Sequence, residues 1–165
     1  MVEIRKSYKA GISFGLVSGV LTTLGLLIGL GVSTQSKAAV IGGILTIAIA
    51  DALSDSFGVH LSQESSGTNS KRNVWEATFS TFFSKFFIAI SFLIPVIMFN
   101  LKTSVIVSVL WGLLLIGSLS LLVSKSNGDR RKEILGVISE HLVLFLIVVS
   151  SSYLAGYLIE SLRLS

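Results

Sequence analysis

The segment AAVIGGILTIAIADALSDSFGVH, residues 38–60, joins a long apolar run to two aspartates that lie one helical turn apart. A helix needs about 20 mostly apolar residues to cross the hydrocarbon core of a bilayer, and this segment is long enough to do so. A carboxylate at the centre of such a helix costs about 2.5–3.5 kcal/mol on insertion scales. A chain that only had to span the membrane would not carry two. The segment therefore predicts a membrane helix that contains either a functional site or a buried ion pair.

The composition extends this prediction to the whole chain. Of the 165 residues, 52% are hydrophobic and 13% are charged, and the mean hydropathy is +0.84. A soluble domain carries about 25% charged residues. Apolar segments of spanning length occur at residues 11–32, 38–60, 77–100, 103–123 and 134–162. We therefore predict an all-α, polytopic membrane protein, with five transmembrane helices in one domain over residues 1–165.

The basic residues predict an orientation. Lysine and arginine favour the inner side of a membrane, and an internal N-terminus leaves nine of them inside and three outside, with Lys85 inside a span. The inner residues are Arg5, Lys6, Lys9, Lys71, Arg72, Lys125, Arg130, Arg131 and Lys132, and the outer ones are Lys37, Lys102 and Arg163. We expect an N-inside, C-outside protein of a prokaryotic plasma membrane. The pI near 9.6 then reflects topology and not nucleic-acid binding. The first span is too long for a signal peptide and no cleavage site follows it, so we expect it to be retained.

Asp51 and Asp55 are the strongest candidates for a site. Their i, i+4 spacing places both carboxylates on one helix face, about 6 Å apart along the axis. Two charges this close disfavour joint ionisation. Three interpretations remain open: a cation or proton site, an ion pair with a lysine, or a neutral hydrogen-bonded pair.

Several further polar residues are expected at the same depth in the membrane as this pair. At 1.5 Å per residue, several polar side chains of different spans lie about 8–12 Å from the inner boundary. They are Ser18, Asp55, Lys85 and Glu140, with Asp51 and Thr22 about one turn deeper. We expect these oxygen-bearing side chains to form a path for a cation. Lys85 either extends to the membrane surface or pairs with Asp55 or Glu140.

Other candidates are weaker. His60 and His141 are metal ligands only if they turn toward the same cavity, and Glu64 lies in the longest polar loop. The chain contains no HExxH, GxGxxG or GxxxxGK[ST] motif and no catalytic triad, so we expect no enzyme. A metal-assisted hydrolase using the two aspartates is the weakest alternative, because no nucleophile can be identified.

Four segments in order resemble the vacuolar iron transporter family. FGLVSGVLTTLGLLIGL (residues 14–30) is similar to the family's FGxxDGLVTTFAxVAG, and ADALSDSFGVHLSQES (50–65) to its AGALSMAxGEYLSxxxE. FLIPVIMF (92–99) resembles the LIP segment of the third helix, and SSYLAGYLIE (151–160) the terminal TYLIGRLL. The resemblance covers nearly the whole chain. It implies a homodimer with the first helix at the two-fold axis, a path for divalent metal between the protomers, and exchange of Fe²⁺ or Mn²⁺ for protons.

The chain departs from this pattern at the positions that matter for metal. By the resemblance, Ser18 stands where the family has an aspartate, Asp55 where it has a methionine, and Val59 where it has a glutamate. Asp51 replaces a small residue, and the family's glutamate-rich metal-binding insert shrinks to SQESSGTNSKRN (62–73), with Glu64 alone. Replacing a thioether by a carboxylate favours oxygen-preferring cations.

Our hypothesis is a dimeric transporter of divalent cations such as Fe²⁺ or Mn²⁺, coupled to protons through competition for the aspartates. The expected metal ligands are Asp51, Asp55, Ser18, Thr22, Glu140, Glu64 and His60, with Lys85 in an ion-pairing or proton-coupling role. The expected partners are the lipid bilayer, a second copy and the transported cation, with no bound cofactor and no nucleic acid. The alternative is a non-transporting membrane protein that an internal Asp–Lys pair stabilises.

Overall fold

The computed structural model describes residues 2–67, 70–127 and 131–164, and the regular structure of these residues is entirely helical. The elements are α1 (Val2–Thr34), α2 (Lys37–Thr46), the π-helical turn η1 (Ile47–Asp51), α3 (Ala52–Ser65), α4 (Lys71–Ser91), α5 (Leu93–Met98), α6 (Leu101–Asn127) and α7 (Arg131–Leu164). Five stretches are long and apolar enough to cross a membrane: Lys6–Thr34, Lys37–Ser65, Lys71–Met98, Leu101–Leu122 and Ile134–Leu162. The all-helical class and the five apolar spans are confirmed for these residues. The orientation stays a prediction, and Arg130, one of its basic residues, lies outside the described residues.

The helices are longer than their apolar segments. The third stretch was expected to begin at residue 77 but begins at Lys71, because the backbone N–H of Asn73 donates a hydrogen bond of 3.3 Å to the Ser70 hydroxyl. A serine cap satisfies one of the free N–H groups of the first turn. The polar residues that follow can therefore be helical without being apolar.

The third stretch is interrupted near its only proline. α4 ends at Ser91 and α5 begins at Leu93, and the N–H of Phe92 turns back to the Ala89 carbonyl at 3.1 Å. Proline lacks an N–H, so Pro95 cannot donate to the carbonyl of Ser91. The helix therefore breaks one turn before the proline.

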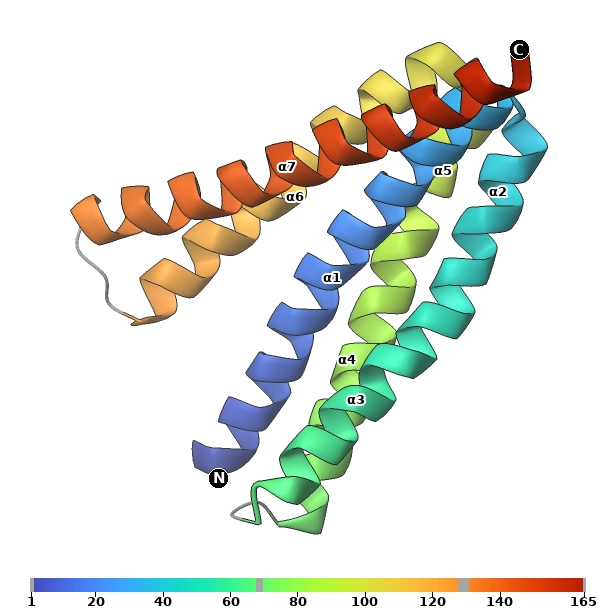
Figure 1. The fold of residues 1–165 in the computed structure, drawn as a ribbon. Helices are drawn as coiled ribbons and strands as arrows, with labels where there is room; N and C mark the ends of the chain where they lie inside the picture. The colour runs from blue at the N-terminus through green and yellow to red at the C-terminus, as the bar shows by residue number, and fades with distance from the viewer. Residues whose placement is uncertain (1, 68–69, 128–130, 165) are drawn as a thin grey trace. The chain divides into compact units, whose positions relative to one another are not determined.

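Packing divides the chain into two units. The first comprises Met1–Thr23 and Ile44–Leu93, and so holds most of α1 together with η1, α3 and α4. Figure 1 shows α3 and α4 running side by side within it. Its core is small-residue rich, with Val20, Ile44, Ala48, Ala52, Val74, Ala77, Ala89 and Phe92 buried. Small side chains allow these helices to approach closely, which is how membrane helices pack.

A glycine stripe brings α1 against α4 in this first unit. A Cβ added at Gly15 would lie 2.6 Å from the carbonyl oxygen of Thr81, and one added at Gly11 would lie 2.5 Å from that of Ala77. The hydroxyl of Thr81 also donates to the Gly11 carbonyl at 3.3 Å. Glycines at four-residue spacing let another helix approach closely, either from the same chain or from a second copy. In this structure it packs within the chain.

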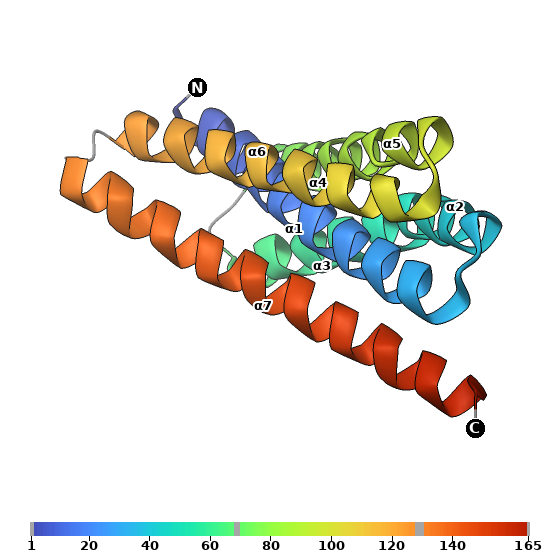
Figure 2. The same ribbon diagram turned by 90° about the horizontal axis from the view of Figure 1, so that it is seen from above.

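The second unit comprises Leu24–Gly43 and Ile94–Ser165. Here α6 packs against α7, and Figure 2 shows the two helices diverging from the end of α6. The end of α1 meets α7 through another pair of glycines, because a Cβ on Gly156 would lie 2.8 Å from the Gly29 carbonyl. Leu24, Leu27, Ile28, Val40, Val96, Ile116 and Phe145 form the core of this unit.

Candidate cation site

Lys85 is the centre of the polar cluster in the first unit. It lies on the face of α4 that packs against α1 and α3, and its side chain has 0% exposure. The backbone of α1 reaches this level of α4 at Gly15 and Gly19, where an added Cβ would lie 3.2 Å from the Lys85 N and O atoms, respectively. The ammonium group is buried inside this packing and contacts no solvent. The alternative in which Lys85 extends to the membrane surface is therefore wrong.

Two carboxylates and one hydroxyl surround the ammonium group. Lys85 Nζ lies 2.6 Å from Asp51 Oδ2 and also forms an ion pair and a hydrogen bond with Asp55 Oδ2. It donates a further hydrogen bond of 2.9 Å to the Ser18 hydroxyl. Ser18 in turn donates to Asp55 Oδ2 at 2.6 Å. Helices α1, α3 and α4 and the turn η1 each contribute one side chain to this cluster.

The two aspartates are held differently. Asp55 accepts hydrogen bonds from both Lys85 and Ser18, whereas the contact of Asp51 Oδ2 with Lys85 is an ion pair by distance without hydrogen-bond geometry. The Asp51 side chain is 32% exposed and that of Asp55 is 23% exposed. With every group ionised, the cluster carries a net charge of −1. Lys85 is fully buried, whereas both aspartates reach the surface of the first unit.

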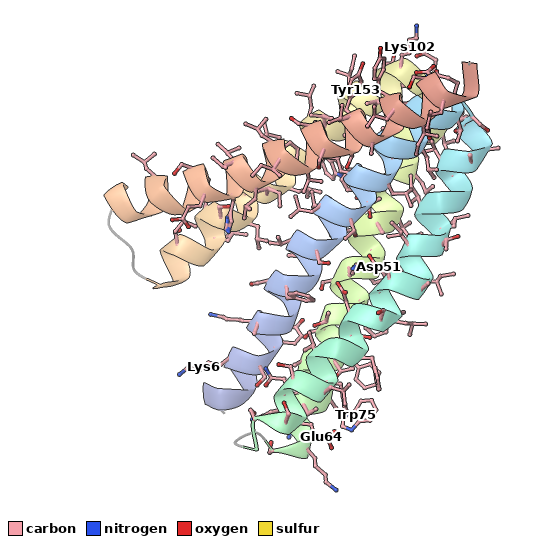
Figure 3. All side chains as sticks on the ribbon, viewed as in Figure 1. Lys6, Asp51, Glu64, Trp75, Lys102 and Tyr153 are labelled. Carbon is pink, nitrogen blue, oxygen red and sulfur yellow. The ribbon has the colours of Figure 1, made fainter. Side chains whose placement is uncertain are left out.

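A local change of helix geometry precedes the cluster. Residues Ile47–Asp51 form a π-helical turn, and the N–H of Ala52 bonds to the Ile47 carbonyl five residues earlier. Figure 3 places Asp51 partway along the long helix, at the end of this turn. Single π-turns inside α-helices occur often at functional sites. Both aspartates, one at the end of this turn and one in the helix after it, reach Lys85.

A cavity of about 570 Å³ adjoins the cluster at Asp55. It lies within the first unit, and α3 supplies most of its wall. The lining residues are Ala10, Phe14, Ser54, Asp55, Gly58, Val59, Ser62, Gln63 and Ala77. Sequence reasoning missed Ser54, Gly58 and Ser62, although their spacing of four residues marks one face of a helix.

Two other predicted ligands of the first unit, Thr22 and Glu64, do not join the cluster. Thr22 donates its hydroxyl proton to the Ser18 carbonyl at 2.8 Å, within α1. Glu64 is exposed in the last turn of α3, where Figure 3 labels it, and Glu140 is exposed on α7 in the second unit. Of the expected metal ligands in the first unit, Asp51, Asp55 and Ser18 lie together, and the role of Glu140, which belongs to the second unit, stays a prediction.

Each histidine is bound to a hydroxyl of its own unit. His60 Nδ1 lies 3.0 Å from the Thr78 hydroxyl, and His141 Nδ1 lies 2.7 Å from the Ser120 hydroxyl. Both hydroxyls donate their single proton at 2.7 Å to a backbone carbonyl one turn earlier, at Val74 and Ile116. Each Nδ1 therefore carries a proton that it donates to the hydroxyl oxygen.

Among the described residues there is no group of three or more His, Cys, Asp or Glu side chains that could hold a metal ion. The donors at hand are two carboxylates and a hydroxyl, all oxygen ligands, which suit hard cations such as Mg²⁺ and Mn²⁺. In this arrangement the Lys85 ammonium group takes the position that a cation would need.

Comparison of the chain with protein-family models, with curated proteins and with solved structures finds no match.

Proposed function

We propose that this protein is a membrane carrier for divalent cations, in which Asp51 and Asp55 bind the cation in exchange for the Lys85 ammonium group. The observation that supports this most is the shared lysine: two carboxylates from one helix contact a single, fully buried ammonium group. A cavity beside Asp55 supplies the space through which a cation can approach.

The charge balance favours a carrier over a purely structural pair. One aspartate is enough to neutralise Lys85, and a second carboxylate in a membrane costs free energy. Two carboxylates and one divalent cation are neutral together, whereas two carboxylates and one ammonium group leave a charge of −1. The second aspartate therefore has a function if a divalent cation displaces Lys85 from the two carboxylates.

Displacement of Lys85 also couples the binding of a cation to the release of protons. The cation and the ammonium group need the same oxygen atoms, because Lys85 contacts Oδ2 of both aspartates. Protons compete for these oxygens too. A site that holds either Lys85, protons or one cation exchanges them by competition, and a conformational change that alters its exposure turns the exchange into transport.

The proposal includes the predicted membrane arrangement. We place the N-terminus in the cytoplasm of a prokaryotic cell, on the basis of nine inner against three outer basic residues. We also keep the homodimer that the resemblance to the vacuolar iron transporter family implies. Because α4 occupies the glycine stripe of α1 in unit 1, the seam between protomers has to use another face.

Uptake of Mn²⁺ or Fe²⁺ into proteoliposomes tests the proposal. Asp55→Asn should abolish uptake, because it removes one of the two charges that balance the cation. Glu64→Gln is the matched control, because it removes a carboxylate that lies outside the cluster and should leave uptake unchanged. Uptake by Asp55→Asn at the rate of the unmodified protein would remove Asp55 from the mechanism.

A second candidate function follows from the same cluster. Lys85 engages both carboxylates and Ser18 at once, which is also what a structural crosslink among three helices needs. The protein would then be a non-transporting membrane component. The response of Lys85→Met to divalent cations, described in the Discussion, separates the two functions.

A further inference from the structure

A groove of about 500 Å³ lies between α1 and α4 in the first unit. Helix α4 supplies most of its wall, and Tyr8 and Ile12 of α1 supply the rest. The lining residues of α4 are Arg72, Trp75, Glu76, Phe79, Ser80, Phe83, Ser84 and Phe87. None of these residues belongs to the ion-pair cluster, so the groove is a separate feature of this unit.

The long part of the groove is aromatic. Phe79, Phe83 and Phe87 follow one another at intervals of four residues and therefore lie on one face of α4. At least half of each side chain is exposed, and the rings of Phe83 and Phe87 stack with their centroids 6.3 Å apart. This face belongs to the apolar stretch Lys71–Met98, which is long enough to cross a membrane. In a bilayer such a face contacts hydrocarbon chains.

The end of the groove near the start of α4 is polar. Trp75, which Figure 3 labels near the α3–α4 loop, stacks on Phe79 with ring centroids 5.4 Å apart, and Tyr8 lines the same groove from α1. Tryptophan and tyrosine are enriched at the level of lipid headgroups. Arg72 lies one turn before Glu76, and its side chain is 75% exposed. This end of the groove therefore has the composition of the membrane surface.

The length of the groove matches one leaflet of a bilayer. At 1.5 Å per residue, α4 rises about 22 Å between Arg72 and Phe87. A bilayer with its headgroups is about 40–45 Å thick, so one leaflet is about half of that. A single phospholipid can therefore extend from the polar end of the groove to its aromatic end.

Arg72 and Glu76 give the polar end one positive and one negative group. Arg72 donates its Nε–H to Glu76 Oε1 at 2.9 Å, so its two terminal nitrogens can donate to a phosphate. Glu76 Oε2 is a buried acceptor for which the described part of the chain supplies no hydrogen-bond donor. Such an acceptor is stabilised when an occupant brings a donor. The pair is therefore complementary to a headgroup that contains both a phosphate and a protonated amine.

We infer that this groove binds a phospholipid whose headgroup carries a phosphate and a primary ammonium group, as in phosphatidylethanolamine. The phosphate accepts hydrogen bonds from Arg72, and the ammonium group donates to Glu76. One acyl chain lies along the three phenylalanines. Phosphatidylcholine has no N–H to donate, and phosphatidylglycerol brings a net negative charge beside Glu76. The inference is independent of the proposed cation transport.

Quenching of tryptophan fluorescence by brominated lipids tests the inference, because bromine quenches an indole ring that it contacts. The sequence contains two tryptophans, Trp75 in the groove and Trp111 on α6 in the second unit. The Trp111→Phe protein therefore reports on the groove, and the Trp75→Phe protein is the matched control.

Each protein is reconstituted into bilayers of phosphatidylethanolamine, phosphatidylcholine and phosphatidylglycerol, with one class at a time brominated on its acyl chains. The dependence of quenching on mole fraction gives the relative binding constants of the three classes. In Trp111→Phe we expect phosphatidylethanolamine to bind at least threefold more strongly than either other class. In Trp75→Phe the three classes should quench equally.

A second substitution tests the contact with the ammonium group. Glu76→Gln in the Trp111→Phe background removes the carboxylate and leaves Arg72 without its negative neighbour. The preference should then change at least threefold, away from phosphatidylethanolamine and toward phosphatidylglycerol. Glu64→Gln in the same background is the control, because Glu64 is exposed on α3 and does not line the groove.

Three results would contradict the inference. Equal binding constants for the three classes at Trp75, or a preference for phosphatidylglycerol, would overturn the assignment of the headgroup. An unchanged preference in Glu76→Gln would remove the contact between Glu76 and the ammonium group. No quenching of Trp75 by any brominated lipid would show that protein, such as a second copy of the chain, covers the groove.

Discussion

Lys85 of α4 donates a hydrogen bond to Asp55 of α3, and no part of the Lys85 side chain is exposed. This contact joins two helices that a polar loop separates in the sequence. The same ammonium group also lies 2.6 Å from Asp51 Oδ2, so one lysine serves two carboxylates. The cluster therefore has two acidic groups for one basic group. Substitutions of these groups should change the stability of the protein in ways that can be measured.

Replacing the aspartates one at a time should be tolerated, and replacing both should not. Asp51→Asn and Asp55→Asn each leave Lys85 with one carboxylate and a neutral net charge. The double variant leaves a buried ammonium group without a counter-charge, which destabilises a protein by about 3–5 kcal/mol. We expect its loss of stability, measured by thermal unfolding in detergent, to exceed the sum of the single losses. Additive losses of stability would mean that the buried Lys85 does not need either aspartate as a counter-charge. The control is the double variant Glu64→Gln, Glu140→Gln.

Removing the lysine should make the protein dependent on divalent cations. Lys85→Met leaves two neighbouring carboxylates and lowers the unfolding temperature. If these carboxylates are the cation site, Mn²⁺ should restore stability, because a ligand at 100 times its Kd stabilises by about 2.7 kcal/mol. The increase in unfolding temperature should be larger in Lys85→Met than in the unmodified protein, where the ammonium group competes.

The control for this experiment is Lys102→Met, which alters an exposed lysine. Loss of stability in Lys85→Met without any response to Mn²⁺, Fe²⁺ or Mg²⁺ would support the structural crosslink and contradict the carrier.

The contact of α1 with α4 should be sensitive to a single methyl group. In Gly15→Ala the new Cβ would lie 2.6 Å from the Thr81 carbonyl oxygen, so the helices must separate. Overpacking of this kind costs about 1–3 kcal/mol. Gly117→Ala meets open space and should be neutral or slightly stabilising. Equal unfolding temperatures for the two variants would contradict the close approach of α1 and α4.

The hydrogen bonds of the histidines predict their tautomers. Nitrogen NMR of the neutral rings should show a protonated Nδ1 and an acceptor Nε2 at both His60 and His141. Thr78→Val removes the acceptor for His60 Nδ1 and should shift that ring toward the other tautomer, while His141 stays unchanged. An unaltered His60 spectrum in Thr78→Val would show that another group holds the ring.

The number and place of the apolar spans could be read from the sequence, because the thickness of the hydrocarbon core imposes a length and a composition on any helix that crosses it. The serine cap at Ser70 and the helix break before Pro95 depend on short-range interactions in the sequence, because each involves the hydrogen-bonding groups of only a few neighbouring residues. The pairing of Asp51 with Asp55 as one candidate site was also readable, because helical periodicity alone places them on one face.

Tertiary structure decided what these residues touch. The spacing of the aspartates does not say whether Lys85 approaches them, because that depends on how α4 is rotated about its axis and how closely glycines let α1 pack against it. For the same reason depth alone grouped Thr22 with the site, whereas its hydroxyl turns back to its own helix. The cavity beside Gly58 also depends on packing. The sequence shows that residue 58 is a glycine, but only the positions of the neighbouring helices determine whether another side chain fills the space beside it.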